Sequence, residues 1–188
     1  MIGGNAYDNS WSPLNARDFG VPQNRRRIYI VGILKVIKKS TFEFPTPIGS
    51  CSIHHVLDPL PPVTPSLSTV PGEPGSHAHK NFLRSLPKIM STEHPFKTPW
   101  IIDLGGSSDH CMKDMCPCLT RARAGSGQFW STMHGRPVTT KETLRFMAMK
   151  PSRLNFAGLS ERQVRMLIGN SMSVNVLEAP ACDSIASD

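Results

Sequence analysis

The sequence of 188 residues has no uninterrupted apolar run of about eighteen residues, the length that a membrane-spanning helix requires. The residues after Met1 also lack the charged start, apolar centre and small-residue cleavage site of a secretory signal. We therefore expect a soluble protein that is not secreted and has no membrane partner. Its expected location is the cytoplasm, or the nucleus if the source is a eukaryote.

Cysteine is scarce, and its odd count of five fits reduced thiols better than a disulfide framework. Four potential zinc ligands lie close together in the sequence, namely His110, Cys111, Cys116 and Cys118. Zinc accepts four such ligands in tetrahedral geometry, but the adjacent His110 and Cys111 are awkward ligands for one loop, and no paired C-x-x-C spacing occurs. We predict free thiols and no metal site.

Acidic residues are outnumbered, with 14 Asp and Glu against 21 Lys and Arg, and the net charge is +7. A basic surface favours a polyanionic partner such as nucleic acid, because lysines and arginines that neutralise phosphates release counterions. The hydrophobic content of 39% is sufficient for a core. Eleven of the 17 prolines lie in the span from Pro45 to Pro99, which predicts a loop-rich segment there.

The most informative segment is a Gly20-Val-Pro22 turn that leads into Gln23-x-Arg25-x-Arg27 and an apolar run at 28–34. The run predicts a strand covered on both faces. Arginines at i and i+2 of an extended segment point to the same side, and their planar guanidinium groups suit phosphate oxygens or a nucleobase carbonyl. The alternative is a basic strand start whose arginines are solvated or pair with surface acids.

Further elements are predicted from local patterns. Capping-box patterns at Thr139-x-x-Glu142 and Ser160-x-x-Gln163 predict two helices, the first ended by Pro151. The other expected elements are short strands at 41–44, 100–104 and 116–124, a helical turn at 53–57, a mobile span at 59–79, a left-handed cap at Gly169, and a final helix from Asn170 to Leu177.

Three of these segments resemble DNA (cytosine-5) methyltransferases. Gln23-x-Arg25-x-Arg27 resembles the family's Gln-x-Arg-x-Arg motif, Arg136-x-x-Thr-x-x-Glu142-x-x-Arg145 resembles the segment that supports target recognition, and Gly169-Asn170-Ser171 resembles the last motif beside the cofactor. The resemblance implies an α/β fold: a partial Rossmann-like methyltransferase domain with an inserted, irregular, loop-rich target-recognition domain. The implied division is methyltransferase strands at 1–44, target recognition at 45–135, and returning methyltransferase helices at 136–188.

The resemblance also implies a chemistry. In the family a cysteine thiolate attacks C6 of a flipped cytosine, a carboxylic acid engages N3, and S-adenosyl-L-methionine supplies the methyl group to C5 of cytosine in double-stranded DNA. Arg27 would contact the base O2, and Arg25 would support that site or bind a neighbouring phosphate. The implied cofactor-binding residues are Asn170 and Ser171, and the implied DNA-binding residues are Gln23, Arg25, Leu119, Thr120 and Arg136.

Three family elements are missing: the Phe-x-Gly-x-Gly cofactor loop, the Pro-Cys-Gln nucleophile segment and the Glu-Asn-Val acid segment. All three would precede Leu14, and Pro117-Cys118 lies on the wrong side of the arginine strand to replace the nucleophile. We therefore expect an inactive fragment with an incomplete cofactor pocket, whose partner is the missing amino-terminal part of the catalytic domain. The alternatives are a non-enzymatic DNA-binding or regulatory protein and a fragment of a transfer-RNA cytosine-5 methyltransferase.

Overall fold

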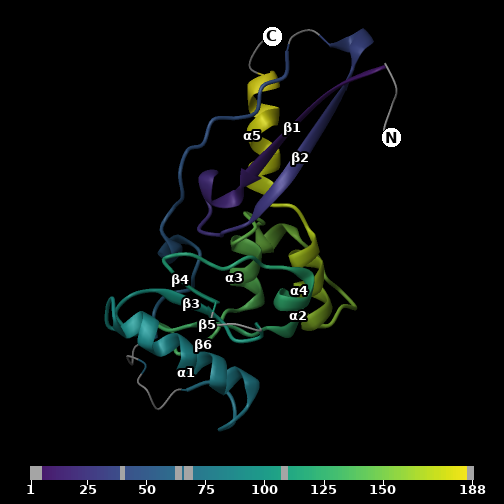
Figure 1. Ribbon diagram of the computed structural model, residues 1–188. Helices are drawn as coiled ribbons and strands as arrows, with labels where there is room; N and C mark the ends of the chain where they lie inside the picture. The colour runs from purple at the N-terminus through teal and green to yellow at the C-terminus, as the bar shows by residue number, and fades with distance from the viewer. Residues whose placement is uncertain (1–5, 39–40, 62–64, 66–69, 107–109, 186–188) are drawn as a thin grey trace.

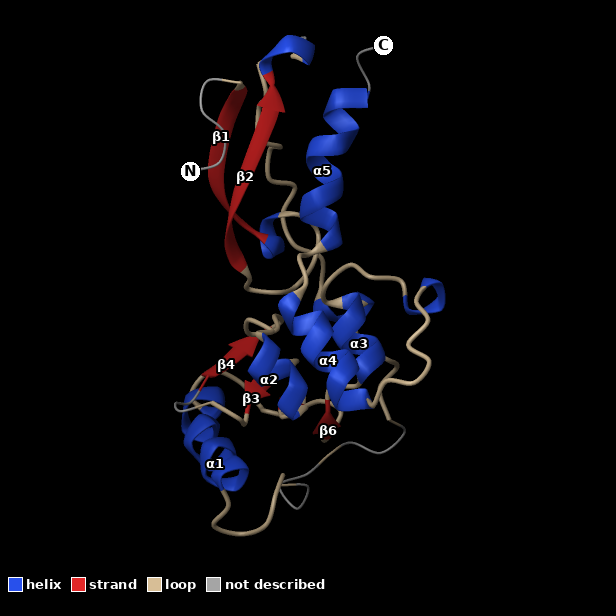
Figure 2. Ribbon diagram, turned by 90° about the vertical axis from the view of Figure 1, so that its right-hand side faces the viewer, coloured by secondary structure: helices blue, strands red, loops and turns tan. Residues whose placement is uncertain are grey.

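The computed structural model describes residues 6–38, 41–61, 65, 70–106 and 110–185. One part of the molecule is a long hairpin, in which β1 (Tyr7–Asn15) pairs antiparallel with β2 (Arg26–Leu34). Helix α5 (Val174–Ile185) runs beside this hairpin, as Figures 1 and 2 both show. The core between them is formed by Leu14, Ala16, Phe19, Val21, Tyr29 and Val176. The C-terminal helix therefore covers one face of the N-terminal hairpin.

The other face of the hairpin has no cover within the described part of the chain. Ile28 and Ile30 of β2 are 66% and 70% exposed, and Trp11 opposite Ile30 is 68% exposed. Side chains alternate along a strand, so burying Tyr29 against α5 turns both isoleucines to solvent. The prediction that this strand is covered on both faces is wrong, because among the described residues only α5 covers it.

The second part contains an antiparallel sheet in the order β4-β3-β5-β6. Its strands are β3 (Trp100–Asp103), β4 (His110–Lys113), β5 (Phe129–Ser131) and β6 (Arg136–Pro137). Helix α1 (His77–Met90) packs against it through Phe82 and Ile89, which share a core with Trp100 and Ile102. The alternate residue Ile101 belongs to the core on the helical side. The sheet is thus buried between α1 and the remaining helices.

The helices on that side are α2 (Arg121–Ser126), α3 (Thr140–Arg145) and α4 (Glu161–Asn170). Short 3-10 turns are η1 (Ala16–Asp18), η2 (Lys35–Ile37), η3 (Ile53–His55) and η5 (Pro151–Arg153). Both predicted capping boxes are present, at Thr139 and at Ser160. The strand predicted at 100–104 and the turn predicted at 53–57 are also confirmed.

Several local predictions are wrong. No strand forms at 41–44, and the strand predicted at 116–124 is replaced by α2, which begins after the Thr120 N-cap. Helix α3 ends at Arg145, well before Pro151, because Ala148 adopts a left-handed conformation with φ 57°. Helix α1 was not predicted, and it begins inside the span expected to be mobile; positions 62–64 and 66–69 of that span lie outside the described residues.

The C-terminal helices also differ from the prediction. Gly169 lies inside α4 and is not a left-handed cap, and Asn170 ends α4 instead of capping the next helix. A Cβ at Gly169 would lie 2.5 Å from the carbonyl oxygen of Thr120. Glycine is needed there because the backbones of α4 and α2 approach closely. On the predicted apolar face of α4, Val164 and Ile168 are buried, but Leu167 is 54% exposed.

The α/β prediction is confirmed as a mixed fold of sheets and helices. Within the described residues, no helix has the length and apolar character needed to cross a membrane.

Candidate functional site

The site begins with two arginines at the base of the hairpin, where it meets the second part of the molecule. The side chains of Arg25 and Arg27 both reach Cys118, with Nη1 of Arg25 at 4.0 Å and Nη2 of Arg27 at 3.4 Å from its Sγ. The i and i+2 guanidinium groups therefore lie on one side of the segment, as the extended backbone predicts. Cys118 comes from 91 residues further along the chain than Arg27.

Backbone contacts fix this junction. The N–H of Cys116 donates to the carbonyl of Pro22 at 2.7 Å, and the N–H of Asn24 donates back to the carbonyl of Cys116 at 2.9 Å. The Asn15 side chain accepts from the N–H of Arg25 at 2.8 Å. These bonds hold the start of β2 against the segment that precedes α2, so both arginines are placed by rigid backbone.

Arg25 is buried and joins three chain segments. Its guanidinium donates to the carbonyl oxygens of Leu119 at 2.5 Å, Ser171 at 2.6 Å and Gly169 at 3.3 Å. Burial lowers the pKa of Arg25, and the nearby charge of Arg27 lowers it further. The guanidinium is occupied by protein carbonyls, which suits a supporting role better than direct contact with a phosphate.

Arg27 is half-buried, and its guanidinium forms fewer hydrogen bonds than that of Arg25. Its Nη1 donates to the carbonyl of Arg26 at 2.8 Å, and among the described residues its Nη2 contacts only the Cys118 thiol, a weak acceptor. No carboxylate of the described residues forms an ion pair with Arg25 or Arg27. Two adjacent cations without an acid retain a strong preference for an acceptor from outside the chain. The site can therefore bind an electron-rich oxygen, such as a carbonyl or a phosphate.

Two neighbours complete the polar environment. Gln23 is fully buried, and neither atom of its amide has a hydrogen-bond partner in the described structure. Tyr29 follows Arg27 on the same side of β2, and burial raises the pKa of its hydroxyl despite the two arginine charges. A buried amide without a hydrogen-bond partner lowers the stability of the fold, and Gln23 is such a group beside the arginine site.

The predicted cofactor residues lie at the end of α4. Asn170 is exposed, and its amide has no partner in the described part of the chain. The Ser171 hydroxyl donates to the carbonyl of Ile168 at 2.7 Å, and the Ser171 carbonyl accepts from Arg25. The structure thus brings the two predicted cofactor residues next to Arg25, the residue predicted to support the base contact.

The remaining predicted DNA contacts are dispersed. Leu119 is fully buried, and Thr120 accepts from the N–H of Arg123 as the N-cap of α2. The guanidinium of Arg136 forms a two-point ion pair with Glu142, at 2.7 and 2.9 Å. Of these three, only Leu119 contacts the arginine site, and it does so through its backbone carbonyl.

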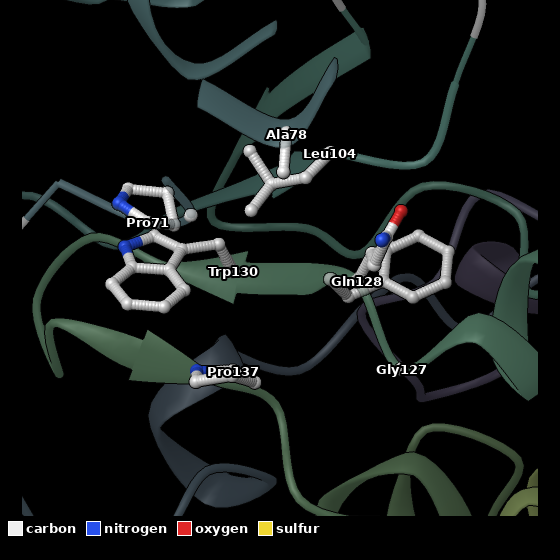
Figure 3. Close-up of a pocket in the computed structure, with 9 residues that line it drawn as sticks. Pro71, Ala78, Leu104, Gly127, Gln128, Trp130 and Pro137 are labelled. Atoms are coloured by element: carbon white, nitrogen blue, oxygen red, sulfur yellow. The ribbon is translucent and has the colours of Figure 1, made fainter. Parts of the chain in front are cut away.

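A separate pocket of about 230 Å³ lies on the sheet of the second part, between the start of α1 and β6. Figure 3 shows Trp130 next to Pro71, with Pro137 below it and Gln128 at the other end of the view. The remaining lining residues are Gly72, Ala78, Leu104, Gly127 and Phe129. The pocket contains none of the residues predicted from the sequence, and it does not adjoin Arg27.

The cysteines do not form a metal centre in the described structure. No group of three or more His, Cys, Asp or Glu side chains among the described residues is arranged to hold an ion. Cys116 is fully buried, and burial raises the pKa of its thiol well above the usual value. Cys118 is instead half-buried beside the arginines, a position that no local sequence pattern indicated.

Comparison with known proteins places the chain in a family. The family of C-5 cytosine-specific DNA methylases matches residues 2–183. The chain is 31% identical over 175 residues to the type II methyltransferase M.HaeII of Haemophilus aegyptius, covering 93% of this chain and 49% of that protein. It is 30% identical over 167 residues to M.NgoBI of Neisseria gonorrhoeae, covering 88% of this chain and 47% of that protein.

Solved structures agree on the fold. The Entamoeba histolytica methyltransferase EhMeth superposes with a TM-score of 0.55 at 15% identity, covering 96% of this chain and 55% of that one. A mutant of Spodoptera frugiperda DNMT2 gives a TM-score of 0.51 at 16% identity, covering 97% of this chain and 59% of that one.

This chain belongs to the C-5 cytosine-specific DNA methylase family. It spans about half the length of the curated relatives that it matches.

Proposed function

We propose that this chain forms the base-contacting and DNA-recognition portion of a DNA cytosine-5 methyltransferase. The observation that carries the proposal is the pair Arg25 and Arg27, held side by side without a carboxylate partner in the described structure of a chain of this family. In this proposal Arg27 donates to O2 of a cytosine turned out of the duplex. Arg25 holds Arg27 in position, because its guanidinium binds the carbonyls of Leu119 and Ser171.

The proposed division assigns 1–44 and 136–188 to the methyltransferase domain and 45–135 to an inserted target-recognition domain. The C-terminal helices pack on different parts of the molecule. Helices α3 and α4 share a core with residues of the segment 45–135, whereas α5 packs on the hairpin. In this proposal the recognition segment reaches the arginine site through the backbone carbonyl of Leu119, and Thr120 is a DNA contact next to it. Gln23, beside the arginine site, and Arg136, outside it, help to shape the surface that meets DNA.

Asn170 and Ser171 are the proposed contacts to S-adenosyl-L-methionine, which supplies the transferred methyl group when bound. The fit rests on the free amide of exposed Asn170 and on the Ser171 hydroxyl, which donates to Ile168 but keeps its lone pairs for a further hydrogen bond. Both groups suit the charged end of an amino-acid-like ligand. In this proposal the rest of the cofactor pocket is not formed by this chain.

The uncovered hairpin face supports a partner. Trp11, Ile28 and Ile30 form an exposed apolar row on the side opposite α5. A two-stranded ribbon with one open apolar face gains stability when a second layer covers it. We assign this face to the amino-terminal portion of the catalytic domain, the partner that the missing family motifs predict; the chain covers 49% of M.HaeII.

Methyl transfer from labelled S-adenosyl-L-methionine tests whether this chain recognises DNA without catalysing the transfer by itself. We expect no incorporation into duplex DNA by the purified chain, because the nucleophile and acid segments of the family are missing from its sequence. Turnover by the chain alone would refute this assignment. Competition binding distinguishes a DNA substrate from an RNA substrate. If transfer RNA displaces bound duplex DNA from the chain more effectively than unlabelled duplex DNA does, an RNA substrate is favoured.

A further inference from the structure

Helix α1 carries three cations along one line. Lys80, Arg84 and Lys88 are spaced at i, i+4 and i+8, and all three are exposed. The opposite face of the helix buries Phe82 and Ile89 against β3, so the cations point away from the protein. Figures 1 and 2 show α1 at the end of the molecule opposite to the hairpin. We call Lys80, Arg84 and Lys88 the α1 ridge.

The charges of the α1 ridge are not balanced within the described structure. None of the three side chains forms an ion pair or a hydrogen bond with a described residue. Glu93, which follows the helix, is held by Lys113 and Thr98. Like charges at i and i+4 repel by a few tenths of a kcal/mol per pair, so the ridge is mildly unfavourable until an anion binds it.

We propose that the α1 ridge binds the phosphodiester backbone of duplex DNA, as a contact separate from the arginine site. The eight-residue step from Lys80 to Lys88 is about 12 Å long at 1.5 Å per residue. Successive cations of the ridge are about 6 Å apart along the helix, so each of the three can meet a different phosphate of one DNA strand. Three flexible cations at this spacing recognise charge and not sequence. This inference rests on the proposed DNA-binding function and names a further surface for it.

The salt dependence of duplex binding tests the ridge. Each phosphate neutralised contributes about 0.9 to the slope of log affinity against log salt concentration. The variant K80Q/R84Q/K88Q should therefore lower the magnitude of that slope by about 2 to 3 in fluorescence anisotropy with a duplex oligonucleotide. The matched control K97Q/K141Q/K150Q removes the same charge from three exposed lysines that lie outside α1 and form no ion pair with a described residue.

The outcomes separate the two proposals. A lower slope in the ridge variant and a nearly unchanged slope in the control support the ridge. Equal slopes in wild type and ridge variant, or the same decrease in both variants, would overturn it while leaving the arginine site in place. Failure of the wild-type chain to bind duplex DNA would overturn both. Thermal melting should show both variants folded, because exposed substitutions change stability by about 0.5 kcal/mol or less.

Discussion

Glu142 provides the sharpest test of how the second part of the molecule is held together. Its carboxylate is fully buried, accepts two hydrogen bonds from Arg136, and accepts the N–H groups of Thr139 at 2.7 Å and Asp58 at 2.9 Å. Burial by itself would raise the pKa of Glu142, but these donors lower it from 4.5 to about 2. The ionised carboxylate therefore stabilises the fold by tying Asp58, at the start of the predicted recognition segment, to α3.

The magnitude follows from that pKa. Each pKa unit corresponds to about 1.4 kcal/mol, so the lowering contributes about 3 kcal/mol to the free energy of unfolding. Because the folded pKa lies below the unfolded pKa, this stability is present above about pH 4.5 and is lost as the pH falls toward 2. Glu142→Gln should therefore destabilise the chain by about 3 kcal/mol at pH 7, and the difference from wild type should shrink at low pH.

Urea denaturation of both proteins at pH 7 and pH 3 measures this difference. The control is Glu161→Gln, which removes a carboxylate that is 69% exposed and 3.3 Å from Arg165. An exposed pair of this kind contributes about 0.5 kcal/mol or less. A Glu142→Gln effect that equals the Glu161→Gln effect, or that stays constant between the two pH values, would refute the reasoning.

Three further changes should follow from packing. Gly169→Ala should destabilise the chain by about 1 to 3 kcal/mol in urea denaturation, because the new Cβ would meet the backbone of Thr120; no loss would contradict the close approach of α4 and α2. Arg25→Ala should cost about 3 kcal/mol in the same assay by leaving buried carbonyls unpaired, and a cost as small as that of an exposed arginine would contradict the clamp. Ile30→Ser should change stability by less than about 0.5 kcal/mol in this chain, since Ile30 is already exposed; a large loss would show that the hairpin face is covered.

The features that the sequence predicted correctly are those with local causes. The helix starts at Thr139 and Ser160 follow from reciprocal hydrogen bonds within four residues, and the same-side placement of Arg25 and Arg27 follows from the period of an extended chain. The strand at Trp100 is a short apolar run that ends at glycines. In each case the evidence lies within one short window.

The features that were missed depend on distant contacts. Gly169 has the pattern of a helix cap, but its role is set by the backbone of Thr120, about fifty residues earlier in the chain. Helix α1 is amphipathic and begins after the Ser76 N-cap. It was missed because it contains Pro87 and follows a proline-rich segment, and both features are typical of loops. Pro117-Cys118 resembles the nucleophile segment of the family, which drew attention away from the actual position of Cys118. Its thiol lies beside Arg27 through a tertiary contact that no local pattern indicates.

Affinity for duplex DNA, compared between Arg27→Ala and Arg26→Ala, tests the central claim most directly. The two arginines are adjacent and of equal charge, but Arg26 is exposed, whereas Arg27 lies in the site beside Cys118. Loss of a charge-assisted contact predicts that Arg27→Ala weakens binding about tenfold or more, and that Arg26→Ala has a much smaller effect. Equal affinities for the two variants, or a greater loss for Arg26→Ala, would contradict the assignment of Arg27 as the base-contacting residue.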